Sequence, residues 1–152
     1  MTIWIDADAC PVPVRDIIIR ASQRTQCPLV FVANSPLPLP TRTLIKRVQV
    51  PQGFDVADNY ILQHATDKDL VVTQDIPLAA ELVALKICAL NPRGELYTPE
   101  NIRQRLAMRN FAQEMRDIGQ ITGGQNKFAD KEKQAFANAL DRWLQKNKPC
   151  TA

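Results

Sequence analysis

Short apolar, β-branched runs alternate with helix-like segments through the first ninety residues, and this alternation restricts the fold more than any other feature. Strand-like runs lie at 3–7, 29–33, 47–50, 70–73 and 87–90, and helix-like segments lie at 14–24, at 55–66 and from 75 onward. Short β-α-β connections of this kind predict a parallel sheet with helices on both faces. We therefore expect a three-layer α/β/α fold with a sheet of about five strands.

Prolines mark the boundaries of several of these segments. Pro11 and Pro13 open the first helix, and Pro77 falls in the first turn of the third, where the missing N–H costs little. Three further prolines within 35–41 predict an extended loop between the second and third strands.

Beyond residue 97 the pattern changes to two long helices. One is predicted from Thr98, a suitable N-cap, to about 117, and the other from about 129 to 147, with a glycine-containing segment at 119–127 between them. A chain of 152 residues is the usual size of one domain. We predict a single domain, 1–152, in which 1–97 form the α/β core and 98–152 a helical C-terminal part.

Composition excludes several classes of protein. Hydrophobic residues make up 45% and charged residues 23%, without an apolar run long enough to span a membrane or a basic, apolar leader. We therefore expect a cytoplasmic protein. The four cysteines are far apart and His64 is the single histidine, so the sequence does not favour a structural zinc site. Cys27 and Cys88 lie beside apolar runs and are predicted to be buried.

The net charge of +3 is distributed unevenly along the chain. Residues 1–98 contain 9 Lys and Arg against 10 Asp and Glu, whereas residues 99–152 contain 10 against 6. An acidic site joined to a basic part suits an anionic polymer. A solvated helical surface explains the same balance equally well.

Acidic and polar side chains follow several of the predicted strands. Asp6 and Asp8 follow the first, Asn34 and Ser35 the second, and Thr73 and Asp75 the fourth, while Asp58 lies near the start of the second helix. Asp6 and Asp8 would share a face if the first strand reached residue 8. Ligands of parallel sheets bind at the carboxyl ends of the strands. Converging carboxylates repel one another, and a bound Mg²⁺ or Mn²⁺ removes that cost.

Simpler explanations exist for some of these acids. Asp75 and Asp55 could be helix N-caps, and Asp8 could cap the entry to the first helix. Asp6 has no capping role at the end of a strand. We interpret Asp6, Asp8, Asp58 and Asp75 as metal ligands. The same four residues and Thr73 are the predicted catalytic residues.

The motifs at 5–11, 55–61, 69–79 and 123–128 resemble the YaiI/YqxD family, small and largely uncharacterised bacterial proteins, over nearly the whole chain. That family is similar to the PIN-like nucleases, which have strand order 3-2-1-4-5 and an acid cluster that binds Mg²⁺ or Mn²⁺. The resemblance implies that Asp6, Asp58 and Asp75 are the acidic residues of the site. It implies that Asp8 is either an additional metal ligand or a residue that contacts the ligands without binding the metal. It also implies that Thr73 orients a water or a phosphate.

The basic C-terminal part offers candidates for substrate binding. Arg103, Arg109 and Arg116 recur six and seven positions apart on the long helix, and we expect that they can share a face. Gly123, Gly124 and Lys127 lie in a segment that is either a substrate-side lid or a plain connection between helices, and it lacks the spacing of a P-loop. With Asn34 and Ser35, we predict that Arg103, Arg109, Gly123, Gly124 and Lys127 bind substrate.

Three functions are compatible with the sequence. The first is a metal-dependent phosphodiesterase that cleaves RNA, or alternatively DNA, without a His, Cys or Ser nucleophile. The second is a phosphatase of the haloacid-dehalogenase type, since Asp6-Ala7-Asp8 mimics its nucleophile motif, but Lys68 and Lys86 are poorly placed for it. The third is a non-catalytic RNA-binding or regulatory module with a vestigial metal site. The sequence leaves a homodimer open.

Overall fold

The computed structural model describes residues 2–34, 36, 44–53, 56–117 and 130–146, and for 9 and 109–117 it describes the backbone alone. A five-stranded sheet lies at the centre, with strand order β3-β2-β1-β4-β5 and every neighbouring pair parallel. The strands are β1 (Ile3–Asp6), β2 (Leu29–Ala33), β3 (Ile45–Gln49), β4 (Leu70–Val72) and β5 (Cys88–Leu90). The predicted three-layer fold and the order 3-2-1-4-5 are confirmed.

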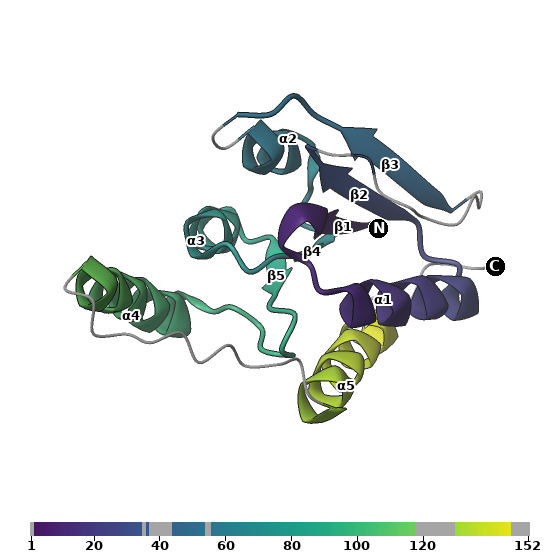
Figure 1. Cartoon of the computed structure of the whole chain (residues 1–152). Coiled ribbons are helices and arrows are strands. Elements are labelled where there is room, and N and C mark those ends of the chain that lie inside the picture. The colour runs from purple at the N-terminus through teal and green to yellow at the C-terminus, as the bar shows by residue number, and fades with distance from the viewer. Residues whose placement is uncertain (1, 35, 37–43, 54–55, 118–129, 147–152) are drawn as a thin grey trace.

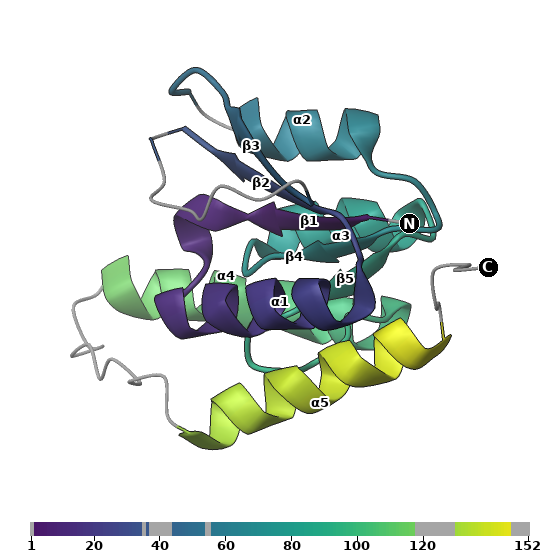
Figure 2. The same cartoon turned by 90° about the vertical axis from the view of Figure 1, so that its right-hand side faces the viewer.

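Helices cover both faces of the sheet (Figures 1 and 2). α1 (Val12–Thr25) and α5 (Asp130–Lys146) pack on one face, and α2 (Val56–His64) and α3 (Ile76–Ala84) pack on the other. α4 (Pro99–Asp117) packs against α3 on the outer side of that second layer. None of the described helices has the length and apolarity needed to cross a membrane.

Alternation along the strands divides the core between the two faces. Ile3 and Ile5 of β1 belong to the cluster beneath α1 and α5, and Trp4 belongs to the cluster beneath α2 and α3. Side chains of a strand point to opposite faces in turn, so a central strand that is buried on both sides is apolar throughout. All four residues of β1 are buried, and the fourth of them is Asp6.

The last helix, α5, packs beside α1 through a regular stripe of apolar residues. Its buried residues recur three and four positions apart, namely Phe136, Ala139, Leu140, Trp143 and Leu144. This spacing places them on one face of a helix. The stripe completes the cluster around α1, and Arg24 of α1 pairs with Asp141 of α5 at 2.6 Å near the exposed end of the contact.

Element boundaries differ from the predicted ones at informative places. β1 ends at Asp6, and a single 3₁₀ turn, η1 (Ala7–Ala9), follows it. The strand therefore does not reach Asp8. Asp6 and Asp8 do not share a strand face, because Asp8 lies in the 3₁₀ turn. α1 starts at Val12, two residues before the predicted start, because Pro13 falls in its first turn.

Two cysteine predictions have different outcomes. Cys27 is buried, as predicted, and burial raises the pKa of its thiol to about 11. Cys88 is exposed, so its prediction is wrong. Cys88 begins β5, which forms an edge of the sheet, and an apolar neighbourhood in sequence does not guarantee cover at an edge.

Candidate functional site

Asp6 lies at the carboxyl end of the central strand and is 6% exposed. The residues before it and beside it are in register, since Ile5 pairs with Val72 and Val72 pairs with Leu90. Asp6, which ends β1, consequently lies level with Thr73 and Asn91, which follow β4 and β5. This row is the edge where a parallel sheet binds its ligands.

The hydroxyl group of Thr73 joins two of the predicted acidic residues. It donates a hydrogen bond to Asp6 Oδ2 at 3.0 Å and accepts one from the backbone N–H of Asp75 at 3.0 Å. Because the hydroxyl has one proton, accepting from Asp75 directs that proton toward the Asp6 carboxylate. Thr73 therefore fixes the position of Asp6 and the start of the turn into α3.

Asp75 is the N-cap of α3, as its simpler interpretation predicted. Its Oδ1 accepts a hydrogen bond from Leu78 N at 3.0 Å. The side chain is half-buried, and its charge also acts on Asp6. Capping and a place in the acidic site are therefore compatible at this residue.

The environment of Asp6 raises its pKa from an ordinary value of 3.8 to about 6. Burial is the largest cause, and the charges of Asp75 and Asp8 raise it further. The hydrogen bond from Thr73 acts in the opposite direction, because it favours the carboxylate. The structure thus brings the charges of Asp6, Asp8 and Asp75 into one electrostatic neighbourhood.

Asp8 reaches this neighbourhood from the 3₁₀ turn. It is exposed, and its Oδ2 accepts a hydrogen bond from the backbone N–H of Asn34 at 2.9 Å. The bond ties the turn after β1 to the end of β2. Asp8 was also a candidate cap for the first helix. The N-cap of α1 is instead Pro11, which makes no side-chain hydrogen bond, and the Asp8 carboxylate bonds to Asn34 N.

The other predicted site residues that the structure describes lie on helices α2 and α4. Asp58 is half-buried in the first turn of α2. Arg103 is exposed on α4, and its Nε donates to the Pro99 carbonyl of the same helix at 3.4 Å. Several predicted residues lie outside the described part of the chain, namely Ser35, Gly123, Gly124 and Lys127. The side chains of Arg109 and Arg116 are likewise not described.

The fit of these acids to a divalent cation depends on the number of protein ligands. Among the side chains that the structure describes, no group of three or more His, Cys, Asp or Glu could hold a metal ion. The four acids Asp6, Asp8, Asp58 and Asp75 are therefore not gathered into one ready-made cage. Mg²⁺ often takes only one or two carboxylates and completes its shell with waters and substrate phosphates. The donor chemistry of Asp6 with Asp75 or Asp8 fits that kind of site.

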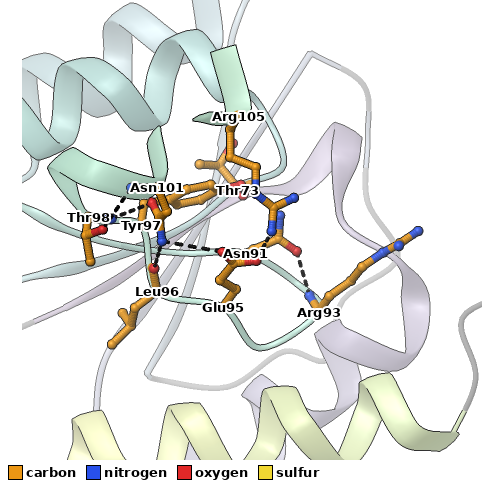
Figure 3. Close-up of polar contacts among 9 residues, drawn as sticks. All are labelled: Thr73, Asn91, Arg93, Glu95, Leu96, Tyr97, Thr98, Asn101 and Arg105. Atoms are coloured by element: carbon orange, nitrogen blue, oxygen red, sulfur yellow. Dashed lines mark hydrogen bonds and ion pairs between the residues drawn. The ribbon is translucent and has the colours of Figure 1, made fainter. Parts of the chain in front are cut away.

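A buried polar network behind Thr73 was not predicted from the sequence. Asn91 Nδ2 donates to the Tyr97 hydroxyl at 2.8 Å, and that hydroxyl donates to the Thr73 carbonyl at 3.2 Å (Figure 3). Asn91 and Tyr97 are both buried. The sequence feature that could have indicated this network is the position of Asn91, a polar residue directly after the fifth predicted strand.

The lysines that a haloacid-dehalogenase mechanism would need lie at the wrong edge. Lys68 precedes β4 and Lys86 precedes β5. Both are therefore at the amino edge of the parallel sheet, whereas Asp6 is at the carboxyl edge. This placement agrees with the sequence-based objection to a phosphatase of that type.

These features define a three-layer α/β/α protein with a buried carboxylate and two neighbouring acids at the carboxyl edge of a parallel sheet. The family described as "Uncharacterized BCR, YaiI/YqxD family" matches residues 4–146, and the chain belongs to this family. No solved structure matches the chain.

Several bacterial relatives are similar over nearly their whole length, and each is named a UPF0178 protein. The relative from Psychromonas ingrahamii is 74% identical and the alignment covers 99% of this chain and all of the relative. The one from Marinobacter nauticus is 56% identical, with 97% and 98% covered. The one from Legionella pneumophila strain Lens is 52% identical, with 97% and 100% covered.

Proposed function

We propose that this protein is a divalent-metal-dependent phosphodiesterase of PIN-like type that cleaves RNA at the carboxyl edge of its sheet. The observation behind this proposal is the position of Asp6, a buried carboxylate with the charges of Asp75 and Asp8 acting on it. A purely structural acid in this position would have a cation or a full set of donors. Among the described residues the Asp6 side chain accepts one hydrogen bond, from Thr73, so a ligand that favours the carboxylate would be stabilising.

Asp6 and Asp75 are the residues that would hold Mg²⁺ or Mn²⁺, with Asp8 beside them and Asp58 as a further predicted ligand. When bound, such an ion lowers the pKa of a coordinated water and offsets charge on a phosphodiester. Thr73 holds Asp6 Oδ2, and Leu78 N holds Asp75 Oδ1, so both carboxylates are fixed before substrate arrives. Preorganised groups lose little freedom on binding.

Calorimetry of Mn²⁺ and Mg²⁺ binding tests the metal directly. Asp75→Asn is the sharpest variant, because asparagine retains an N-cap acceptor for Leu78 N while it removes the charge. We expect Asp75→Asn to weaken Mn²⁺ binding at least about tenfold. Asp67→Asn is the matched control, since Asp67 is exposed before β4 at the opposite edge. Equal Mn²⁺ affinity in all three proteins would contradict the proposal.

Cleavage of labelled RNA and DNA oligonucleotides tests the reaction. We expect metal-dependent cleavage by the wild type, no cleavage by Asp6→Asn, and unchanged cleavage by Asp67→Asn. Persistent cleavage by purified Asp6→Asn would refute the assignment. Tight, salt-sensitive RNA binding with no metal-dependent turnover would instead favour the non-catalytic RNA-binding module.

A further inference from the structure

The turn that follows β5 is closed by several hydrogen bonds of Asn91. The Asn91 backbone carbonyl accepts from Gly94 N at 2.9 Å, and its side-chain Oδ1 accepts from Arg93 N at 2.8 Å. Asn91 N also donates to the Glu95 carbonyl at 2.8 Å. The backbone of Arg93 is therefore fixed at the tip beyond the carboxyl end of β5.

Two contacts hold this turn against the rest of the protein. Gly94 has a φ of +95°, and a Cβ there would lie 2.5 Å from the backbone of Ala135 in α5. On its other side, Asn91 joins Tyr97 and through it Thr73, whose hydroxyl bonds Asp6. The turn is thus packed against α5 and connected by buried hydrogen bonds to the acidic site.

The Arg93 side chain differs from the other arginines near this edge. It is exposed and extends away from Asn91 and Tyr97 (Figure 3), and it has no ion pair among the described residues. Arg105 pairs with Glu95, and Arg15 Nη2 donates to the Ala7 carbonyl at 3.4 Å. Arg93 therefore presents an uncompensated positive charge on a rigid turn.

The position of this charge relative to Asp6 suits a polymeric substrate. β5 and β1 are separated by β4, and neighbouring strands lie about 4.8 Å apart, so the backbones at Asp6 and Asn91 are about 10 Å apart, and Arg93 lies two residues beyond Asn91 in the turn. A nucleic-acid strand has one phosphate per roughly 3.4 Å of helical rise, so this distance spans only a few nucleotides. A phosphate near Arg93 could belong to the same strand as one at Asp6.

We propose that Arg93 binds a backbone phosphate of RNA a few nucleotides from the phosphate at Asp6. This inference rests on the proposed function and adds to it a residue that holds the polymer. Arginine suits the task because its planar guanidinium can donate two parallel hydrogen bonds to a phosphate. The fixed turn keeps the group in place, so less freedom is lost on binding.

Fluorescence anisotropy with a short single-stranded RNA in EDTA tests this assignment without any metal. We expect Arg93→Gln to weaken binding about tenfold and to reduce the slope of log K against log salt by about 0.7. Arg93→Lys should restore the slope but only part of the affinity. Arg142→Gln is the matched control, because Arg142 is exposed on α5 next to Asp141, at the far end of α1.

The outcomes separate this inference from the proposed function. RNA affinity and slope that are equal in wild type and Arg93→Gln, or equally reduced in Arg142→Gln, would overturn the role of Arg93. Absence of RNA binding by the wild type would overturn it as well. The Mn²⁺ calorimetry is independent of Arg93, so loss of RNA affinity in Arg93→Gln without any Mn²⁺ binding would support phosphate binding by Arg93 but refute the metal site and the phosphate at Asp6.

Discussion

Thr73 Oγ1 lies 3.0 Å from Asp6 Oδ2, and this hydrogen bond connects residues 67 positions apart in the sequence. It joins the ends of β1 and β4 at the level where the candidate site begins. The same hydroxyl accepts from Asp75 N, so one side chain positions two acids. The bond is buried, and hydrogen bonds to charged groups contribute more to stability than hydrogen bonds between neutral groups.

Replacement of Thr73 by valine should raise the pKa of Asp6 above about 6, because the bond that favours the carboxylate is lost while burial is retained. The free energy of unfolding should fall by about 1–3 kcal/mol, because Asp75 N also loses its acceptor. Carboxyl-carbon NMR titration measures the first effect and urea unfolding the second. Thr25→Val removes a hydroxyl bonded only within α1 and should leave the pKa of Asp6 unchanged.

Asp6 should make the protein less stable as the pH rises from about 4 to about 6. In this window the folded state retains a proton that the unfolded state, with its ordinary pKa of 3.8, has released. The folded state then binds more protons, so the free energy of unfolding falls with increasing pH, by up to about 3 kcal/mol in total. Urea unfolding at several pH values should show this slope in the wild type. The slope should be absent in Asp6→Asn, and its persistence there would assign it to another group.

Asp69 should be essential for stability but not for metal binding. Its carboxylate is buried and accepts from Thr2 N at 2.9 Å, from Trp4 Nε1 at 3.0 Å and from Thr66 N at 3.0 Å. Asp69→Ala leaves these donors unsatisfied and should cost about 3 kcal/mol or more in urea unfolding. Because Asp69 precedes β4, at the amino edge, Mn²⁺ affinity of the folded variant should equal that of the wild type. Asp67→Asn should change stability by less than about 0.5 kcal/mol.

Gly94→Ala should destabilise the protein by at least about 2 kcal/mol, through both its positive φ and the close approach to α5. Thermal unfolding measures the loss. Gly53→Ala is a suitable comparison, since the nearest described atom to its Cβ would be the side-chain Cγ2 of Val56 at 2.8 Å and its φ lies outside the strained region. Similar losses in the two variants would contradict the argument that the Gly94 turn must contact the backbone of α5.

The sequence determined the layers of this protein, because short continuous apolar runs and amphipathic helices are local properties. The 29–33 strand and the stripe of α5 are clear in the sequence, as is the dual character of Asp75 as a cap and an acid. The resemblance to a known family supplied the strand order. Local patterns do not specify which strands are neighbours, since pairing joins residues far apart in the chain.

Only the tertiary structure decided which polar groups lie together at the carboxyl edge. The early end of β1 placed Asp8 on a 3₁₀ turn, where it bonds Asn34. The network of Asn91, Tyr97 and Thr73 depends on strand register and on the turn after β5. Such contacts arise from packing across the sheet, so no spacing along the chain predicts them. The acids of the site were therefore visible in the sequence, whereas their hydrogen-bond partners and the raised pKa of Asp6 required the fold.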